Sequence, residues 1–177
     1  MKIGERFRQM PVKKRILYIV GVILFTFGLS ILAYFGGRYV YRHLRRAYLL
    51  KTSVVLEIPD LKIKEPVLEG TDSEVLAYAC GHFTESGEGN YCIAGHSSPY
   101  YKYAFNALEN AENGMEIRLY DKEGKCSVYY VADSFIVKPS ETWILDSFGD
   151  ERITLVTCTD DGSERRIVVG EKGEQKE

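Results

Sequence analysis

Hydrophobic and polar positions divide this chain into two unlike parts. Residues 16–35 form an apolar run without a charged side chain, and about twenty helical residues span the roughly 30 Å hydrocarbon core of a bilayer. Beyond residue 52, short apolar and β-branched runs recur between turn residues, as in an all-β barrel or sandwich. The pattern predicts one transmembrane helix followed by one mainly β domain.

Charged segments indicate where each part begins and ends. We expect a basic N-terminal segment at 1–15, the transmembrane helix at 16–35, a basic juxtamembrane linker at 36–51, a folded domain at 52–170 and a charged tail at 171–177. A domain of roughly 120 residues has room for one hydrophobic core but not for two. A cleaved signal peptide would have a shorter apolar region and a small-residue cleavage site, so the helix is expected to remain as an anchor.

Charge bears on the partners and on the orientation of the chain. The formal net charge of −2 favours neither a nucleic-acid partner nor a strongly acidic one. Basic residues flank both ends of the apolar run, with a slight excess before it, which favours a cytoplasmic N-terminus. The β domain would then lie outside the cell.

Within the domain, apolar runs bounded by turn residues predict several strands and few helices. The strands are expected at 54–58, 63–67, 90–94, 115–120, 127–137, 152–158 and 166–169. Residues 121–124 are expected to form a hairpin loop, with Gly124 in the left-handed conformation. Residues 71–74 are typical of a capping box that opens a short helix through Ala79, and 104–108 predict one further helical turn.

Three side-chain types suited to nucleophilic catalysis stand at the ends of predicted strands. One strand ends in Cys158, another leads to Gly95-His96, and Arg165 and Arg166 begin the last strand. A thiolate is a strong nucleophile, an imidazole is a common general acid and base, and a guanidinium can stabilise an oxyanion. The alternative is a buried thiol with ordinary surface charges around it.

Around these residues the chain resembles the sortases, the cysteine transpeptidases of Gram-positive cell surfaces. The sortase signature Thr-Leu-x-Thr-Cys stands at residues 154–158. Further landmarks in family order are Ile58-Pro59, Pro66-Val67, Gly81-His82, Ala94-Gly95-His96 and residues 137–142. The resemblance implies an eight-stranded β-barrel with one or two short helices. The connection between 137 and 152 is short, unlike that of class B, so the chain resembles classes A, C, D or E more closely. An Asp-Pro-aromatic lid of the pilin-polymerising type is absent before the first strand.

The resemblance also implies a role for each candidate residue. Cys158 would be the nucleophile and His96 the general acid and base. Arg166 directly precedes an apolar run, as the sortase arginine does, and would bind the substrate carbonyl and the oxyanion. Some sortases have one intervening residue, so Arg165 is the alternative. Only one of the two can face the thiol, because successive side chains of a strand point to opposite faces.

The other histidines and cysteines have simpler interpretations. His43 lies just past the apolar run among arginines, and His82 precedes a strand, so interfacial and structural roles are expected. Cys80, His82, Cys92 and His96 have a loose spacing for zinc, and we expect no metal. A disulfide between Cys80 and Cys92 is left open by the sequence, because its geometry cannot be derived from spacing.

The resemblance implies a membrane enzyme with an extracellular catalytic domain at 52–170 and without a cofactor, although some class A sortases respond to calcium. It would cleave an LPXTG-like sorting signal of another secreted protein through a thioester, and pass the acyl group to a cell-wall peptide or a pilin lysine. An L,D-transpeptidase is disfavoured, because a Ser-His-Gly-x-Cys neighbourhood is absent around Cys158. A catalytically silent or zinc-stabilised surface-binding module on the same barrel is the alternative from another class.

Overall fold

The computed structural model describes residues 11–100 and 103–173. The predicted basic segment at 1–15 and the predicted tail at 171–177 therefore lie partly outside the described residues. Contacts divide the chain into a helical unit and a barrel unit, with the boundary between Leu44 and Arg45.

The apolar run and the basic residues after it belong to a single helix, α2 (Val12–Thr52). The helix is long and apolar enough to cross a membrane by length and composition, which makes it a candidate span. It continues through the predicted linker because residues 44–51 are mostly leucine, arginine, alanine and lysine, which favour helices. At its end the Ser53 hydroxyl donates a hydrogen bond to Leu49 O (2.6 Å) and satisfies one of the last carbonyls.

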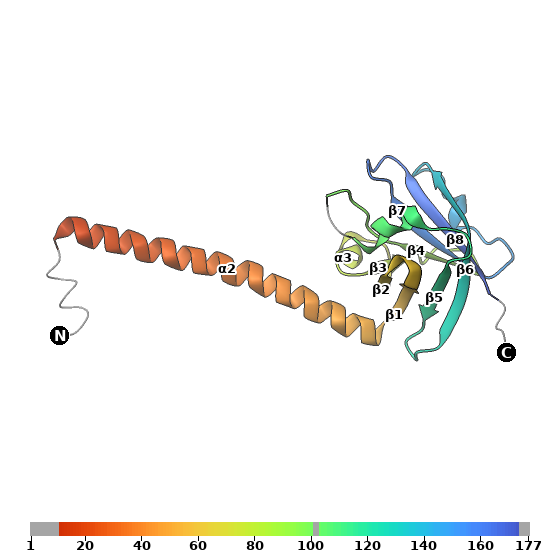
Figure 1. Ribbon diagram of the computed structural model, residues 1–177, viewed down its shortest axis with the longest axis horizontal. Coiled ribbons are helices and arrows are strands. Elements are labelled where there is room, and N and C mark those ends of the chain that lie inside the picture. The colour runs from red at the N-terminus through yellow and green to blue at the C-terminus, as the bar shows by residue number, and fades with distance from the viewer. Residues whose placement is uncertain (1–10, 101–102, 174–177) are drawn as a thin grey trace. The chain divides into compact units, whose positions relative to one another are not determined.

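After α2, the described residues form the predicted β-barrel, closed by eight strands (Figure 1). The strands are β1 (Val54–Ile58), β2 (Ile63–Glu69), β3 (Cys80–His82), β4 (Asn90–Ala94), β5 (Glu116–Tyr120), β6 (Cys126–Val137), β7 (Arg152–Cys158) and β8 (Arg165–Lys172). Around the barrel they follow the order β1-β2-β3-β4-β7-β8-β6-β5. Two pairs, β2–β3 and β4–β7, are parallel, and the others are antiparallel.

Apart from the end of α2, the helical elements described in the barrel unit are short. They are η1 (Pro59–Leu61), α3 (Ser73–Leu76), η2 (Ala104–Asn110) and η3 (Trp143–Leu145). The fully buried Phe105 and Leu108 of η2 join the barrel core, together with side chains from most of the strands. The core therefore fills the barrel and is closed on one side by η2.

Several local predictions are confirmed and others need correction. The hairpin between β5 and β6 has Gly124 at φ 86°, as predicted. The cap of α3 is Asp72, whose carboxylate accepts from two backbone N–H groups, and the helix ends before Ala79. Strand β3 was not predicted, since three residues are too few for a period to be recognised. Its Gly81 is required, because a Cβ there would lie 2.2 Å from Gly70 O.

The boundary at Arg45 leads to a prediction about the minimal barrel unit. Arg46 forms an ion pair with Glu65 of β2 (2.9 Å), and the guanidinium of Arg45 lies over the Tyr78 ring. A fragment that begins at Arg45 should therefore be more stable than one that begins at Thr52, by about 1 kcal/mol or roughly 4 °C in Tm. Calorimetry of both fragments measures the difference. A fragment that begins at Arg38 is the control and should match the Arg45 fragment, whereas equal Tm values for the Arg45 and Thr52 fragments would contradict the boundary.

Candidate active site

The ends of β4 and β7 are tied together up to the residues before His96 and Cys158. The parallel register pairs Ala94 with Val156, and Gly95 N–H donates to Val156 O (3.0 Å). The Thr157 hydroxyl then donates to Gly95 O (2.8 Å). His96 follows Gly95, and Cys158 follows Thr157. The two candidate residues therefore lie at the ends of neighbouring strands.

The thiol and the imidazole border two cavities that share Phe105. Cys158 is half-buried and lines a cavity of about 320 Å³ with Asn106, Thr157 and Arg166, among others. His96 is exposed and lines a cavity of about 210 Å³, with its ring centroid 5.4 Å from that of Tyr103. Both side chains are therefore accessible, as an attacking thiol and a proton carrier need to be.

Gly95 allows the helical element η2 to support this region. A Cβ at Gly95 would lie 2.4 Å from the ring of Phe105, which is almost fully buried. Asn106 of η2 also donates from Nδ2 to Ser98 O (2.7 Å) and accepts from Ser98 N (3.0 Å). Residues of η2 thus contact the chain both before His96, at Gly95, and after it, at Ser98.

The two arginines at the start of β8 point to opposite faces of the β7–β8 ladder. Arg165 pairs with Cys158, whereas Arg166 pairs with Thr157. Directly opposed residues of antiparallel strands have their side chains on the same face. Arg165 donates from Nη1 to two carbonyls of the β7–β8 loop, at 3.0 and 3.3 Å, while Arg166 lines the cavity that also holds Cys158. The strand register therefore places Arg165 on the same face as the Cys158 thiol. Arg166, in contrast, lines the same cavity as the thiol.

All four cysteines are free thiols. Burial raises the pKa of Cys92 to about 12, and burial also raises the pKa of Cys80 far above the usual range. A thiol must lose its proton to become a strong nucleophile. Cys80 and Cys92 are consequently poor nucleophiles, which leaves the half-buried Cys126 and Cys158 as the accessible thiols.

His82 belongs to β3, which is separated from β7 by β4 in the barrel. Its Nδ1 is 2.9 Å from Glu69 Oε2, and its ring stacks on Tyr91 with centroids 4.0 Å apart. These contacts support a structural role. Within the described ranges, no group of three or more His, Cys, Asp or Glu side chains is placed to hold a metal ion.

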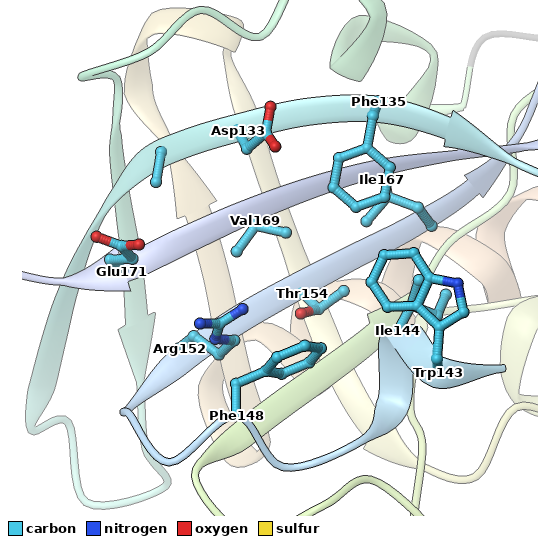
Figure 2. A pocket seen from close by; sticks show the side chains of 11 residues that line it. Asp133, Phe135, Trp143, Ile144, Phe148, Arg152, Thr154, Ile167, Val169 and Glu171 are labelled. Atoms are coloured by element: carbon cyan, nitrogen blue, oxygen red, sulfur yellow. The ribbon is translucent and has the colours of Figure 1, made fainter. Parts of the chain in front are cut away.

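The face of β7 that carries Cys158 also leads to an apolar cavity. Val156, two residues before the thiol, packs with Ile144 and Ile167, and beyond it a cavity of about 420 Å³ opens at Thr154. Figure 2 shows the rings of Phe135, Trp143 and Phe148 projecting into this space. The cavity was not predicted from the sequence, although the chain's single tryptophan and Phe148, both in the β6–β7 connection, were a usable signal.

One end of this cavity is charged. Arg152 donates from Nε and Nη2 to both carboxylate oxygens of Asp150 (2.7 and 2.5 Å), and its guanidinium lies 4.1 Å from the Phe148 ring centroid. The hydrogen bonds from Arg152 lower the pKa of Asp150. Asp133 and Glu171 complete this end (Figure 2). The cavity thus combines aromatic walls with a polar rim.

The closed β-barrel thus carries a thiol, an imidazole and two guanidiniums at the ends of adjoining strands. The family model for the sortase domain matches residues 56–173. Sortase A from Streptococcus agalactiae serotype III (strain NEM316) is 33% identical over 123 residues, which are 64% of this chain and 49% of that protein. The crystal structure of sortase C-1 from Actinomyces oris is similar, with a TM-score of 0.65 and 28% identity, and the match covers 73% of this chain and 81% of that one. A Clostridium perfringens sortase D5 transpeptidase has a TM-score of 0.63 and 26% identity, with 70% and 79% covered.

The chain belongs to the sortase family. The matched region includes His96, Cys158 and both arginines. Family membership supports a transpeptidase function. The chain spans about half the length of the curated relatives it matches.

The bond between Thr157 and Gly95 gives a prediction for the strand ends. Thr157→Val keeps the shape of the side chain but leaves the buried Gly95 carbonyl without this donor, which should lower the free energy of unfolding by about 1–2 kcal/mol. Urea denaturation measures it. Thr157→Ser, which keeps the hydroxyl, should retain more of the stability than Thr157→Val; the reverse order would show that the hydrogen bond is unimportant.

Proposed function

We propose that this protein is a membrane-anchored sortase that cleaves an LPXTG-like sorting signal and transfers the acyl group to an amine. The acceptor would be a cell-wall peptide or a pilin lysine. The observation that carries the proposal is the junction of β4 and β7, which brings the ends leading to His96 and Cys158 together in a barrel of the sortase family.

In the first half-reaction, the Cys158 thiolate attacks the carbonyl carbon of the threonine in the signal. The bond between this carbon and the glycine nitrogen then breaks, and protonated His96 gives its proton to the departing amine. In the second half-reaction, an acceptor that arrives as an ammonium ion first gives one proton to water. The neutral amine then attacks the thioester carbon and loses a second proton to His96 as the carbon–sulfur bond breaks. At the end of the cycle His96 is protonated again and Cys158 is a thiolate again, so the cycle requires no cofactor.

The apolar cavity is suited to the residues that precede the scissile bond. Thr154 and Cys158 are four residues apart on β7, or roughly 13 Å at the rise of a β-strand. An extended peptide from the leucine to the threonine of the signal spans roughly 10 Å. With its threonine carbonyl at Cys158, the signal could therefore place its leucine and proline against Ile144, Val156 and Ile167 and the aromatic walls beyond them.

The sequence predicts Arg166 as the oxyanion stabiliser, with Arg165 as the alternative. The strand register favours Arg165. Arg165 shares a face with Cys158, and Val156 and Ile167 of the same ladder point to that face as well. A substrate bound along this face would contact Arg165. Its Nη1 atom donates hydrogen bonds to two loop carbonyls and would have to rotate to bind the substrate carbonyl. Arg166 supports the opposite assignment through the cavity it shares with Cys158.

The long apolar helix supports membrane anchoring through a single span. With the cytoplasmic N-terminus that the basic flanks favour, the barrel would lie outside the cell, where sorting signals and cell-wall amines are exposed. A silent surface-binding module on the same barrel is the alternative function, but the accessible thiol at the strand end favours catalysis.

The first test concerns the nucleophile. Cys158→Ala should abolish cleavage of an LPXTG peptide and the formation of a covalent thioester, both followed by mass spectrometry. Cys126→Ala is the matched control, because Cys126 is also half-buried, and it should keep most of the activity. Cleavage by the Cys158→Ala protein at the normal rate would exclude the proposed mechanism and favour the silent module.

The second test separates the two arginines. If Arg165 binds the oxyanion, Arg165→Ala should lower kcat by roughly 10²-fold or more. Arg165→Lys should rescue it poorly, because an ammonium does not reproduce the guanidinium fork. Arg166→Ala should then have a small effect. A large loss in Arg166→Ala with little in Arg165→Ala would return the role to Arg166, and small effects in both would remove arginine from the mechanism.

A further inference from the structure

The cavity that His96 lines also includes Arg46, from the end of the helix α2. Its lining residues come from α2, β2, the segment from α3 to β3, and the residues around η2, and they include Arg46, Glu65, Tyr78, His96, Tyr103 and Phe105. All of them belong to the barrel unit, which begins at Arg45. Arg46 of α2 therefore lines the same cavity as the imidazole of His96.

Arg46 is bound to β2 through a fork of hydrogen bonds. Its Nη2 donates to Glu65 Oε1 (2.9 Å) and to Lys64 O (2.8 Å), and its Nε donates to Glu65 Oε2 (3.3 Å). Two-point pairing of a guanidinium with a carboxylate is among the stronger and more directional polar contacts. The Glu65 side chain is only 18% exposed. The positive guanidinium and the negative carboxylate of the pair together add no net charge to the cavity wall.

Arg45 binds a second part of the same wall. Its guanidinium carbon lies 4.0 Å from the centroid of the Tyr78 ring, within the range of a cation–π contact. Tyr78 lies in the connection from α3 to β3 that lines the cavity. Two successive residues of α2 thus hold two different elements around the space beside His96.

We propose that Arg45 and Arg46 are positioning residues for the acceptor amine, which reaches His96 through this cavity. The inference rests on the proposed function, in which His96 takes the proton of the incoming amine. His96 lines this cavity, whereas the Cys158 thiol lines the neighbouring one. The acyl group would occupy the Cys158 face of β7, so the amine has its own path on the His96 side.

The pairing of Arg46 with Glu65 matters because amines arrive largely as ammonium ions. An unpaired guanidinium in the wall would repel such an ion, while the closed pair leaves the wall neutral. The end of α2 would therefore set the affinity for the second substrate and leave the first half-reaction unaffected.

The experiment uses the full chain in detergent micelles, an LPXTG peptide and triglycine as the acceptor. Glu65→Gln, which leaves Arg46 without its carboxylate, should raise the KM for triglycine by about five- to tenfold. The rate of peptide cleavage without acceptor should stay within about twofold. The reversed pair, Arg46→Glu with Glu65→Arg, should bring the KM back toward that of the unmodified chain. Arg42→Ala, one turn earlier in α2 and outside the barrel unit, is the control and should change neither quantity.

An unchanged KM for triglycine in both Glu65→Gln and Arg46→Glu would overturn the inference. Equal losses in cleavage and in transfer would also overturn it, since they would indicate a general structural role. If the unmodified chain cleaves no sorting peptide, the proposed function fails, and this inference fails with it. Arg45→Ala provides a second, milder variant that keeps the ion pair, and its KM for triglycine should rise by about two- to threefold.

Discussion

The parallel pairing of β4 with β7 is the constraint on which the site depends, and two buried side-chain hydrogen bonds hold its register. At one end, the Thr154 hydroxyl donates to Asn90 Oδ1 (2.7 Å), and at the other, the Thr157 hydroxyl donates to Gly95 O (2.8 Å). Asn90 and both threonines are buried, so each of these polar groups is costly to leave unpaired. A slip of one residue would break both bonds and turn Cys158 to the other face of the sheet.

The same asparagine connects this register with the apolar cavity. Asn90 Nδ2 donates to Ile144 O (3.0 Å) and Asp146 O (2.9 Å), which belong to the connection between β6 and β7. Trp143 lies just before these residues and packs parallel to Phe135, with ring centroids 5.9 Å apart. The hydrogen bonds of Asn90 therefore hold both the wall of the cavity and the register of the strand that carries the thiol. A change at Asn90 would affect both.

Sequence patterns were sufficient for the parts of the fold that are periodic or that carry a local signal. The long strands, the Gly124 turn and the apolar helix follow from alternation, turn chemistry and length. Strand β3 could not be found, because its three residues are stabilised by pairing with β2 and β4 rather than by their own pattern. The extension of α2 through the arginines was missed because the polar residues after the apolar run were taken for a linker, although they are good helix formers.

The site was predictable in residue type and less so in geometry. Cys158 and His96 could be chosen from strand ends and from the resemblance to sortases, and both remain proposals for experiment. Whether Arg165 or Arg166 lies on the same face as Cys158 depends on the register between β7 and β8. This register results from the pairing of the two strands and cannot be derived from the sequence of either strand alone. Similarly, Arg46 and Glu65 are nineteen residues apart, and nothing local in either segment indicates that they meet.

The burial of Cys80 and Cys92 has a consequence for oxidative stress. Oxidants react with exposed thiolates, first to sulfenic acid and then to irreversible acids. The two buried thiols keep their protons, whereas Cys126 and Cys158 are within reach of solvent. A peroxide in solution would therefore reach the proposed nucleophile before the buried thiols, and it would block Cys158 while the barrel core stayed intact.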